Sequence, residues 1–213
     1  MKLKHFLFVL GILFVGAGCA PLDTTDSPKE ISVKTDFTAE DRLKWKRIAQ
    51  WPDLCDEDFK IGSDAGLGGL AFYPISETRL ILRVTCGVYA YQNSMLFYLV
   101  NTAEAVPTTQ LLSAPIYDIE NKQIINRTYE YTDDIQEAVL GSDSFDSTNK
   151  TITIFTKERG VGDCGGKNIY RIENKKLILV KFQSLSCEQV EQFRFENPEA
   201  TELPEWPVIY EKK

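Results

Sequence analysis

One short segment concentrates the residue types that could do chemistry: Arg159-Gly160-Val161-Gly162-Asp163-Cys164-Gly165. Its glycines are spaced as G-x-G-x-x-G, the pattern with which dinucleotide-binding proteins bring backbone N–H groups against a pyrophosphate. That chemistry requires a helix N-terminus directly after the glycines, whereas residues 168–173 have the composition of a strand. The segment therefore predicts a tight loop in which glycines take positive φ beside a cysteine, and no cofactor.

Two charged residues of this segment are candidates for contact with a ligand. Arg159 and Asp163 flank the glycines, so a bound molecule would meet both side chains. A short carboxylate in such a position also accepts hydrogen bonds from backbone N–H groups and holds a turn. We favour the structural role for Asp163 and keep a ligand loop of Arg159 and Asp163 as the alternative.

Acidic and amide side chains recur in residues 143–149, Asp143-Ser144-Phe145-Asp146-Ser147-Thr148-Asn149. A calcium loop of the EF-hand type needs alternate oxygen ligands, a central glycine and a glutamate at position twelve. The segment lacks this pattern and predicts a surface turn before the next strand. No metal site is predicted in the chain.

A single histidine, His5, lies in a segment that we expect to be removed. Without it the mature chain has no base for a Ser-His-Asp or Cys-His relay and no imidazole for zinc. Carboxylate pairs of the glycosidase type arise by chance among 31 acidic residues. We therefore predict a protein that is not an enzyme and has no catalytic residue, and keep a carboxylate-based hydrolase as the third functional class.

The charge and composition exclude several broad classes of protein. The net charge is −7, and nucleic-acid binding requires a basic surface. Hydrophobic residues make up 43% and charged residues 26% of the chain, which are ordinary globular values. A fully disordered chain, a polytopic membrane protein and a nucleic-acid partner are all disfavoured.

The first nineteen residues have the features of an export signal. A basic start at residues 1–4 precedes an apolar run at residues 6–15, which is shorter than the ~20 residues that a membrane span needs. Small residues follow at 16–18, directly before Cys19. This arrangement resembles a bacterial lipoprotein signal at residues 1–18, in which Cys19 becomes the acylated N-terminus. The alternative is an ordinary signal peptide with Cys19 as an incidental thiol.

A lipid on Cys19 would make the membrane the first partner of the chain, since two or more acyl chains anchor a protein stably. Residues 19–34 are polar and rich in Pro, Ser and Thr, so they read as a flexible tether. Ala20 replaces the aspartate that retains many lipoproteins at the inner membrane. We therefore expect an outer-membrane protein of the cell envelope on the periplasmic face, with residues 35–213 as one domain.

Four cysteines remain after Cys19 is assigned to the lipid: Cys55, Cys86, Cys164 and Cys187. An even number in an exported chain predicts two disulfides. Of three pairings, we favour Cys55–Cys86 and Cys164–Cys187 because each lies within one half of the domain. No two cysteines have C-x-x-C spacing, which disfavours a four-cysteine metal site.

The pattern of the domain is that of a mainly β protein with one short helix at its start. Thr38 and Asp41 have capping-box spacing before a helix at residues 39–50, which Pro52 ends. A hairpin turn is expected at residues 174–175 and a single helical turn at 133–140. Strands are expected at residues 70–75, 78–86, 95–101, 109–112, 122–132, 151–157, 168–173, 176–184 and 208–211.

Strands at these intervals, without regular helices between them, predict an antiparallel β-barrel or β-sandwich. Tyr89, Tyr91, Phe97 and Tyr98 follow Cys86 closely and are expected in the core, in preference to a sugar-stacking platform.

Several motifs together resemble the bacterial domain of unknown function 1176 family. They include Trp51-Pro52, Ala90-Tyr91 after Cys86, the segment 159–165 with Tyr170 beyond it, and the ending Glu205-Trp206-Pro207-Val208-Ile209-Tyr210. The resemblance covers about Trp45 to Tyr210. It implies an exported protein and supplies no activity.

These observations favour a cell-envelope lipoprotein that acts as a non-enzymatic binding or structural module. Its partner would be an envelope or secreted protein. The alternative is an inhibitor of a secreted basic hydrolase such as lysozyme, because an acidic loop is attracted to a cationic cleft.

The lipoprotein prediction is tested by replacing Cys19 with serine. Cys19→Ser should abolish incorporation of a labelled fatty acid and leave the protein unprocessed or soluble, because serine offers no thiol for acylation. Metabolic labelling and membrane fractionation measure both effects. Normal membrane partitioning of Cys19→Ser would contradict the prediction.

Overall fold

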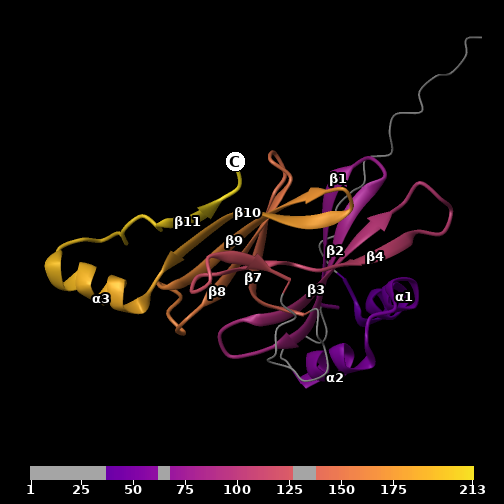
Figure 1. The fold of residues 1–213 in the computed structure, drawn as a ribbon. Helices are drawn as coiled ribbons and strands as arrows, with labels where there is room; N and C mark the ends of the chain where they lie inside the picture. Colours follow the sequence, from indigo (N-terminus) through magenta and orange to yellow (C-terminus); the bar gives the residue numbers. More distant parts are fainter. Residues whose placement is uncertain (1–36, 62–67, 127–137) are drawn as a thin grey trace, which may run out of the picture. The chain divides into compact units, whose positions relative to one another are not determined.

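An antiparallel sheet of nine strands dominates the structure, a computed structural model that describes residues 37–61, 68–126 and 138–213 (Figure 1). All these residues belong to one unit, Val33–Lys213. The elements, in chain order, are α1 (Ala39–Ala49), α2 (Asp53–Ile61), β1 (Leu70–Ser76), β2 (Arg79–Val88), β3 (Asn93–Asn101), β4 (Thr108–Leu112), β5 (Ile116–Asp118), β6 (Gln123–Ile125), β7 (Val139–Asp146), β8 (Thr151–Lys157), β9 (Gly165–Glu173), β10 (Lys176–Leu185), α3 (Cys187–Glu196) and β11 (Val208–Glu211).

The sheet forks at β3. Its strands run in the order β1-β2-β3-β7-β8-β9-β10-β11, and β4 also pairs with β3. β7 pairs with Asn93–Met95, and β4 pairs with Phe97–Asn101, so the two strands share one edge of β3. β1 and β11 are the first and last strands of this order, and among the described strands they do not pair with each other. The sheet is therefore open. The prediction of a mainly antiparallel β fold is confirmed, without a closed barrel.

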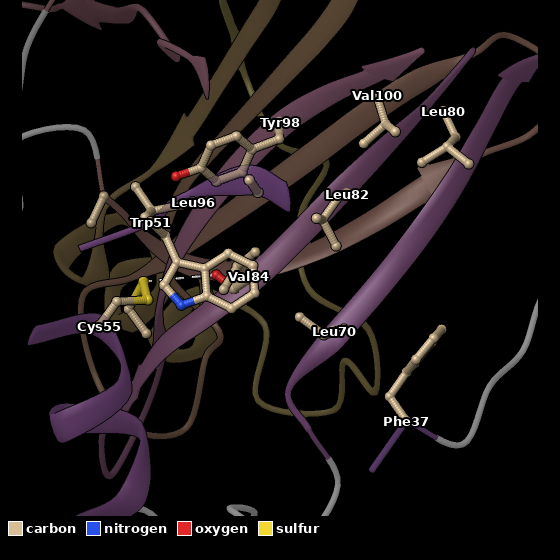
Figure 2. Packing of buried hydrophobic residues seen from close by; sticks show 13 residues of the cluster. Phe37, Trp51, Cys55, Leu70, Leu80, Leu82, Val84, Leu96, Tyr98 and Val100 are labelled. Carbon is tan, nitrogen blue, oxygen red and sulfur yellow. Dashed lines mark hydrogen bonds between the residues drawn. A yellow bond between two sulfur atoms is a disulfide. The ribbon is translucent and has the colours of Figure 1, made fainter. Parts of the chain in front are cut away.

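β3 is buried on both of its faces because two layers pack against it. Met95, Phe97 and Leu99 enter a core shared with Ile154 and Tyr170, so the β1–β4 part of the sheet packs face to face with the β7–β10 part, as in a sandwich. The alternate residues of β3 enter a second core with side chains from β1, β2 and the two N-terminal helices, which Figure 2 shows: Phe37, Trp51, Cys55, Leu70, Leu80, Leu82, Val84, Leu96, Tyr98 and Val100.

The helix α1 begins where its sequence predicts. The Thr38 hydroxyl accepts a hydrogen bond from the Asp41 backbone N–H at 3.2 Å, and the Asp41 carboxylate accepts one from the Thr38 N–H at 2.9 Å. The helix ends at Ala49, one residue before the predicted end, and its C-cap Gln50 takes a left-handed conformation with φ 56°. None of the helices in the described part of the chain has the length and hydrophobicity that a membrane crossing requires.

The hairpin between β9 and β10 turns at Asn174 and Lys175, as expected. Both residues have positive φ, 50° and 61°, which is the conformation of a type I′ turn. Glu173 and Lys176 close the turn as a cross-strand pair of opposite charge.

Other predicted elements differ from the structure. Of the strand expected at 122–132, Gln123–Ile125 form β6 and Asn126 lies outside it, whereas residues 127–137 lie outside the described residues. Val139 and Leu140, expected in a helical turn, belong to β7. This strand continues to Asp146, so the surface turn expected at 143–149 starts only after β7 ends. There Asp146 accepts N–H bonds from Thr148 and Asn149, at 2.8 and 3.0 Å.

Two helices were not predicted. In α2, Cys55 and Phe59 are one turn apart and both are buried, and Pro52 directly precedes the helix. This spacing and the proline are features from which a short helix could have been predicted. The helix α3 starts with a second capping box, in which Ser186 and Gln189 exchange hydrogen bonds of 3.2 and 2.8 Å.

The carboxylate of Asp56 holds α1 and α2 together. It accepts hydrogen bonds from Arg42 Nε at 2.6 Å, Lys46 Nζ at 2.6 Å and the Trp51 indole N–H at 3.1 Å. The Arg42 guanidinium lies 4.2 Å from the centroid of the Phe59 ring and is itself buried. Burial acts to raise the pKa of Asp56, but the hydrogen bonds from Lys46, Trp51 and Arg42 outweigh it and hold that pKa below its usual value.

Replacement of Asp56 should therefore destabilise the domain at neutral pH. Asp56→Asn should lower the free energy of unfolding by about 2–3 kcal/mol at pH 7, because the buried Arg42 loses its counter-charge. A lowered pKa in the native state gives stability that is present above the usual Asp pKa, near 4, and is lost as the pH falls through the native value. Urea unfolding measures the free energy of unfolding of both proteins at pH 7 and pH 3. The difference between the wild type and Asp56→Asn should be smaller at pH 3.

The matched control is Asp53→Asn. Asp53 also contacts Lys46, but its side chain is 89% exposed, so its replacement should have little effect. Equal losses for the two variants at pH 7 would contradict the assigned role of Asp56.

Candidate functional site

The loop between β8 and β9, residues 158–164, is closed at its base and is called the disulfide loop below. The Glu158 N–H donates to the Cys164 carbonyl at 3.2 Å, and the Gly162 N–H donates to the Arg159 carbonyl at 3.0 Å. Gly162 has φ 74°, which favours glycine. The tight loop that the glycine spacing predicts is thus present, and the following residues form β9 rather than the helix that a pyrophosphate site needs.

A disulfide ties this loop to the start of α3. The structure has the two pairs that the sequence favours: Cys164–Cys187 here, and Cys55–Cys86 between α2 and β2. Glu158 lies beside Cys164 and Cys187, and the three form the one cluster of potential metal ligands within the described residues. Because both sulfurs are in the disulfide, they offer no thiolate to a metal.

Asp163 joins the disulfide loop to α3 through two arginines. Its carboxylate receives a bidentate pair of hydrogen bonds from Arg159, at 2.8 and 2.9 Å, and lies 3.0 Å from Arg194. Arg159 also donates to Glu191 of α3 at 2.8 Å. The hydrogen bonds from Arg159 lower the pKa of Asp163 despite its burial, which favours the ionised carboxylate.

Both residues of the predicted ligand loop are therefore engaged with each other. We expected Asp163 to hold the loop by accepting backbone N–H bonds. Its own backbone N–H does contribute, and the structure also places two guanidinium groups against the carboxylate. Arg194 lies 31 positions further along the chain, so no local pattern indicates this contact.

The tip of the loop is exposed and apolar, whereas Glu158 at its base is an exposed carboxylate. Val161 at its tip is 78% exposed, and Tyr91, in the turn between β2 and β3, is 62% exposed. The two turns touch: a methyl group on Gly160 would lie 2.4 Å from Cε1 of Tyr91, so only glycine lets the ring approach this closely. The Lys157 N–H also donates to the Gln92 side chain at 3.4 Å. Tyr91, Gly160 and Val161 form what is called the tip surface below.

This surface was not predicted, because the aromatic residues after Cys86 were expected in the core. Phe97 and Tyr98 are buried there, but Tyr89 and Tyr91 are exposed. The signal was available: Tyr89 and Tyr91 fall between two apolar runs, where a hairpin must turn, and turns lie on the surface.

A cavity of about 500 Å³ between α1 and α2 is a weaker candidate for a binding site. Arg42, Lys46, Asp53 and Asp56 line it, but these charges bind one another in the helix contact described above. They leave no free charged group of that network to recognise a ligand.

A family described as "Protein of unknown function (DUF1176)" matches residues 24–197. The chain belongs to this family. The match includes the disulfide loop and α3, but it stops before Trp206 and β11, which the motif resemblance had included. No curated protein and no solved structure matches this family member.

The arginine contacts of Asp163 predict how its variants behave. Asp163→Asn and Asp163→Ala should both lower the melting temperature by about 3–5 °C, because a neutral side chain leaves two guanidinium groups without their shared counter-charge. Differential scanning calorimetry measures the shift. Glu191→Gln is the control, and it should have a much smaller effect because its side chain is 68% exposed. A wild-type melting temperature for Asp163→Asn would show that hydrogen bonding to the backbone, rather than charge, holds the loop.

Proposed function

We propose that this protein is a membrane-anchored, non-enzymatic binding protein of the cell envelope, and that it contacts a partner protein through the tip surface. One observation carries the proposal: an exposed apolar residue, Val161, sits on a loop that the disulfide and the Asp163 ion pairs restrain. A restrained loop loses little conformational entropy on binding, and this preorganisation strengthens association.

The tip surface also has the composition of a binding surface. Tyrosine is enriched among the residues that dominate binding energy at protein interfaces, and a neighbouring aliphatic side chain adds apolar area to be buried. Tyr91 and Gly160, the chain neighbour of Val161, come from different hairpins and lie in close contact. A partner would thus meet a preformed surface.

The lipid anchor on Cys19 completes the proposal. Residues 19–34 would tether the domain to the membrane and allow a separation of up to about 50 Å when extended. The outer membrane is the favoured location, with the domain in the periplasm. Partners within that distance of the membrane would be accessible to the tip surface.

Inhibition of a secreted basic hydrolase is the second candidate, and the same restrained loop favours it. Residues 19–213 contain 22 basic and 31 acidic residues, so the domain attracts cationic proteins. Asp163 is not the inhibitory group, because its oxygens face Arg159 and Arg194. Val161 would enter the cleft instead.

The proposal is tested by placing a charge on the tip. The full-length protein, purified in detergent, is used to capture partners from envelope extract, and the affinity for any stoichiometric partner is then measured. Val161→Glu should weaken that affinity by about tenfold or more, because a desolvated charge opposes burial of an apolar contact. Lysozyme activity, measured with and without the protein at low and high salt, tests the inhibitor candidate.

Val106→Glu is the matched control, since Val106 is 71% exposed in the turn between β3 and β4. It carries the same substitution outside the tip surface and should leave the affinity unchanged. Both variants should keep the wild-type melting temperature. Wild-type affinity for Val161→Glu would exclude the tip surface as the binding site.

A further inference from the structure

Two strands leave one edge unpaired, and both line the same groove. β4 pairs with β3 on one side, and no described strand pairs with its other side. β11 pairs with β10 only at Lys181–Gln183, so on that side Lys176–Leu179 has no strand partner among the described residues. Unpaired strand edges present backbone N–H and C=O groups that can pair with another chain.

The groove between these edges has a volume of about 470 Å³ and is called the edge groove below. Gln110–Ser113 line one wall and Lys175–Leu179 line the other. The two walls are bridged by a hydrogen bond from the Gln110 side chain to the Lys175 carbonyl, at 3.3 Å. The same cavity is therefore bounded by residues of two strands that are far apart in the chain.

The interior of the edge groove is apolar. Leu112, Leu177 and Leu179 line it and are already buried in the core between the two parts of the sheet, so the apolar side chains open to a ligand are those nearer the mouth. Ile124 and Leu111 also line it and are partly exposed to solvent. An extended peptide places alternate side chains on one face, so it could direct every second residue into such a groove.

The charge of the edge groove is opposite to that of the whole protein. Lys175 and Lys176 are the ionisable residues among its lining, and both are exposed. No carboxylate lines the groove, although the chain has a net charge of −7. This local charge selects an acidic ligand.

We propose that the edge groove binds an extended, acidic peptide segment of a partner protein, which adds a strand to the sheet between β4 and β10. Backbone hydrogen bonds to the two edges supply affinity, and alternate apolar side chains cover Leu111 and Ile124. Acidic residues of the segment pair with Lys175 and Lys176 at one end. β4 has five residues, so the matching segment is about five to seven residues long.

This groove shares no residue with the tip surface. Its lining comes from β4, β10 and the segment around β5 and β6, whereas the tip surface belongs to the β2–β3 and β8–β9 turns. The two proposals therefore fail or succeed separately, and Val161→Glu should not affect the edge groove.

The test uses a library of random twelve-residue peptides, selected against the full-length protein in detergent. Selected peptides should combine acidic residues with alternating apolar residues. Replacing both lysines, Lys175→Glu with Lys176→Glu, should weaken the binding of these peptides by about tenfold or more. N-methylation of alternate peptide N–H groups should weaken binding equally, because each methyl group removes one backbone hydrogen bond.

The matched control reverses two charges on α1, Lys44→Glu with Arg47→Glu, and should leave peptide affinity unchanged. Hydrogen exchange should slow at the backbone N–H groups of β4 and of Lys176–Leu179 when a selected peptide binds. Three outcomes would overturn the proposal. In the first, no selected peptide depends on Lys175 and Lys176 for binding; in the second, phosphatidylglycerol micelles bind through these lysines and no peptide does. In the third, the backbone N–H groups of both edges are already protected in the free protein, because the chain itself fills the groove.

Discussion

The burial of β3 on both faces is the constraint on which the other parts of the structure depend. A strand that is buried on a single face packs into one core, but β3 packs into two cores. The sheet must therefore fold over one face of β3, and the helices α1 and α2 must cover the other face. The Cys55–Cys86 disulfide joins α2 to β2, the neighbour of β3, and holds this cover in place. Because the centre of the sheet is occupied by packing, turns and strand edges remain for binding.

Carboxylates stabilise the two ends of the domain in the same way. Asp56 of α2 binds Arg42 and Lys46 of α1. Asp163 of the disulfide loop binds Arg159 of the same loop and Arg194 of α3. Each carboxylate lies close to a disulfide in the chain. At the first end this arrangement closes a core; at the second it restrains a loop whose apolar tip stays in solvent. The proposed binding role rests on that difference.

Local patterns predicted those elements whose determinants lie within a few residues. The Thr38–Asp41 capping box and the turn at Asn174 and Lys175 depend on neighbouring groups, and both are found where expected. The capping box at Ser186 had an equally local signal and was overlooked. Tyr91 was wrongly predicted to be buried, because the aromatic residues around it resemble those of a buried strand. It lies in a turn, and this position leaves its side chain exposed.

The sequence by itself determined the family, the mainly β class and the absence of histidine from residues 19–213. It also favoured the two disulfide pairs that the structure contains. Only the tertiary structure decided that Asp163 faces Arg194, that Tyr91 packs against Gly160, and that β4 and β10 line one groove. Those contacts join residues tens of positions apart, and their geometry follows from how the sheet forks and folds, which no local spacing of side chains specifies.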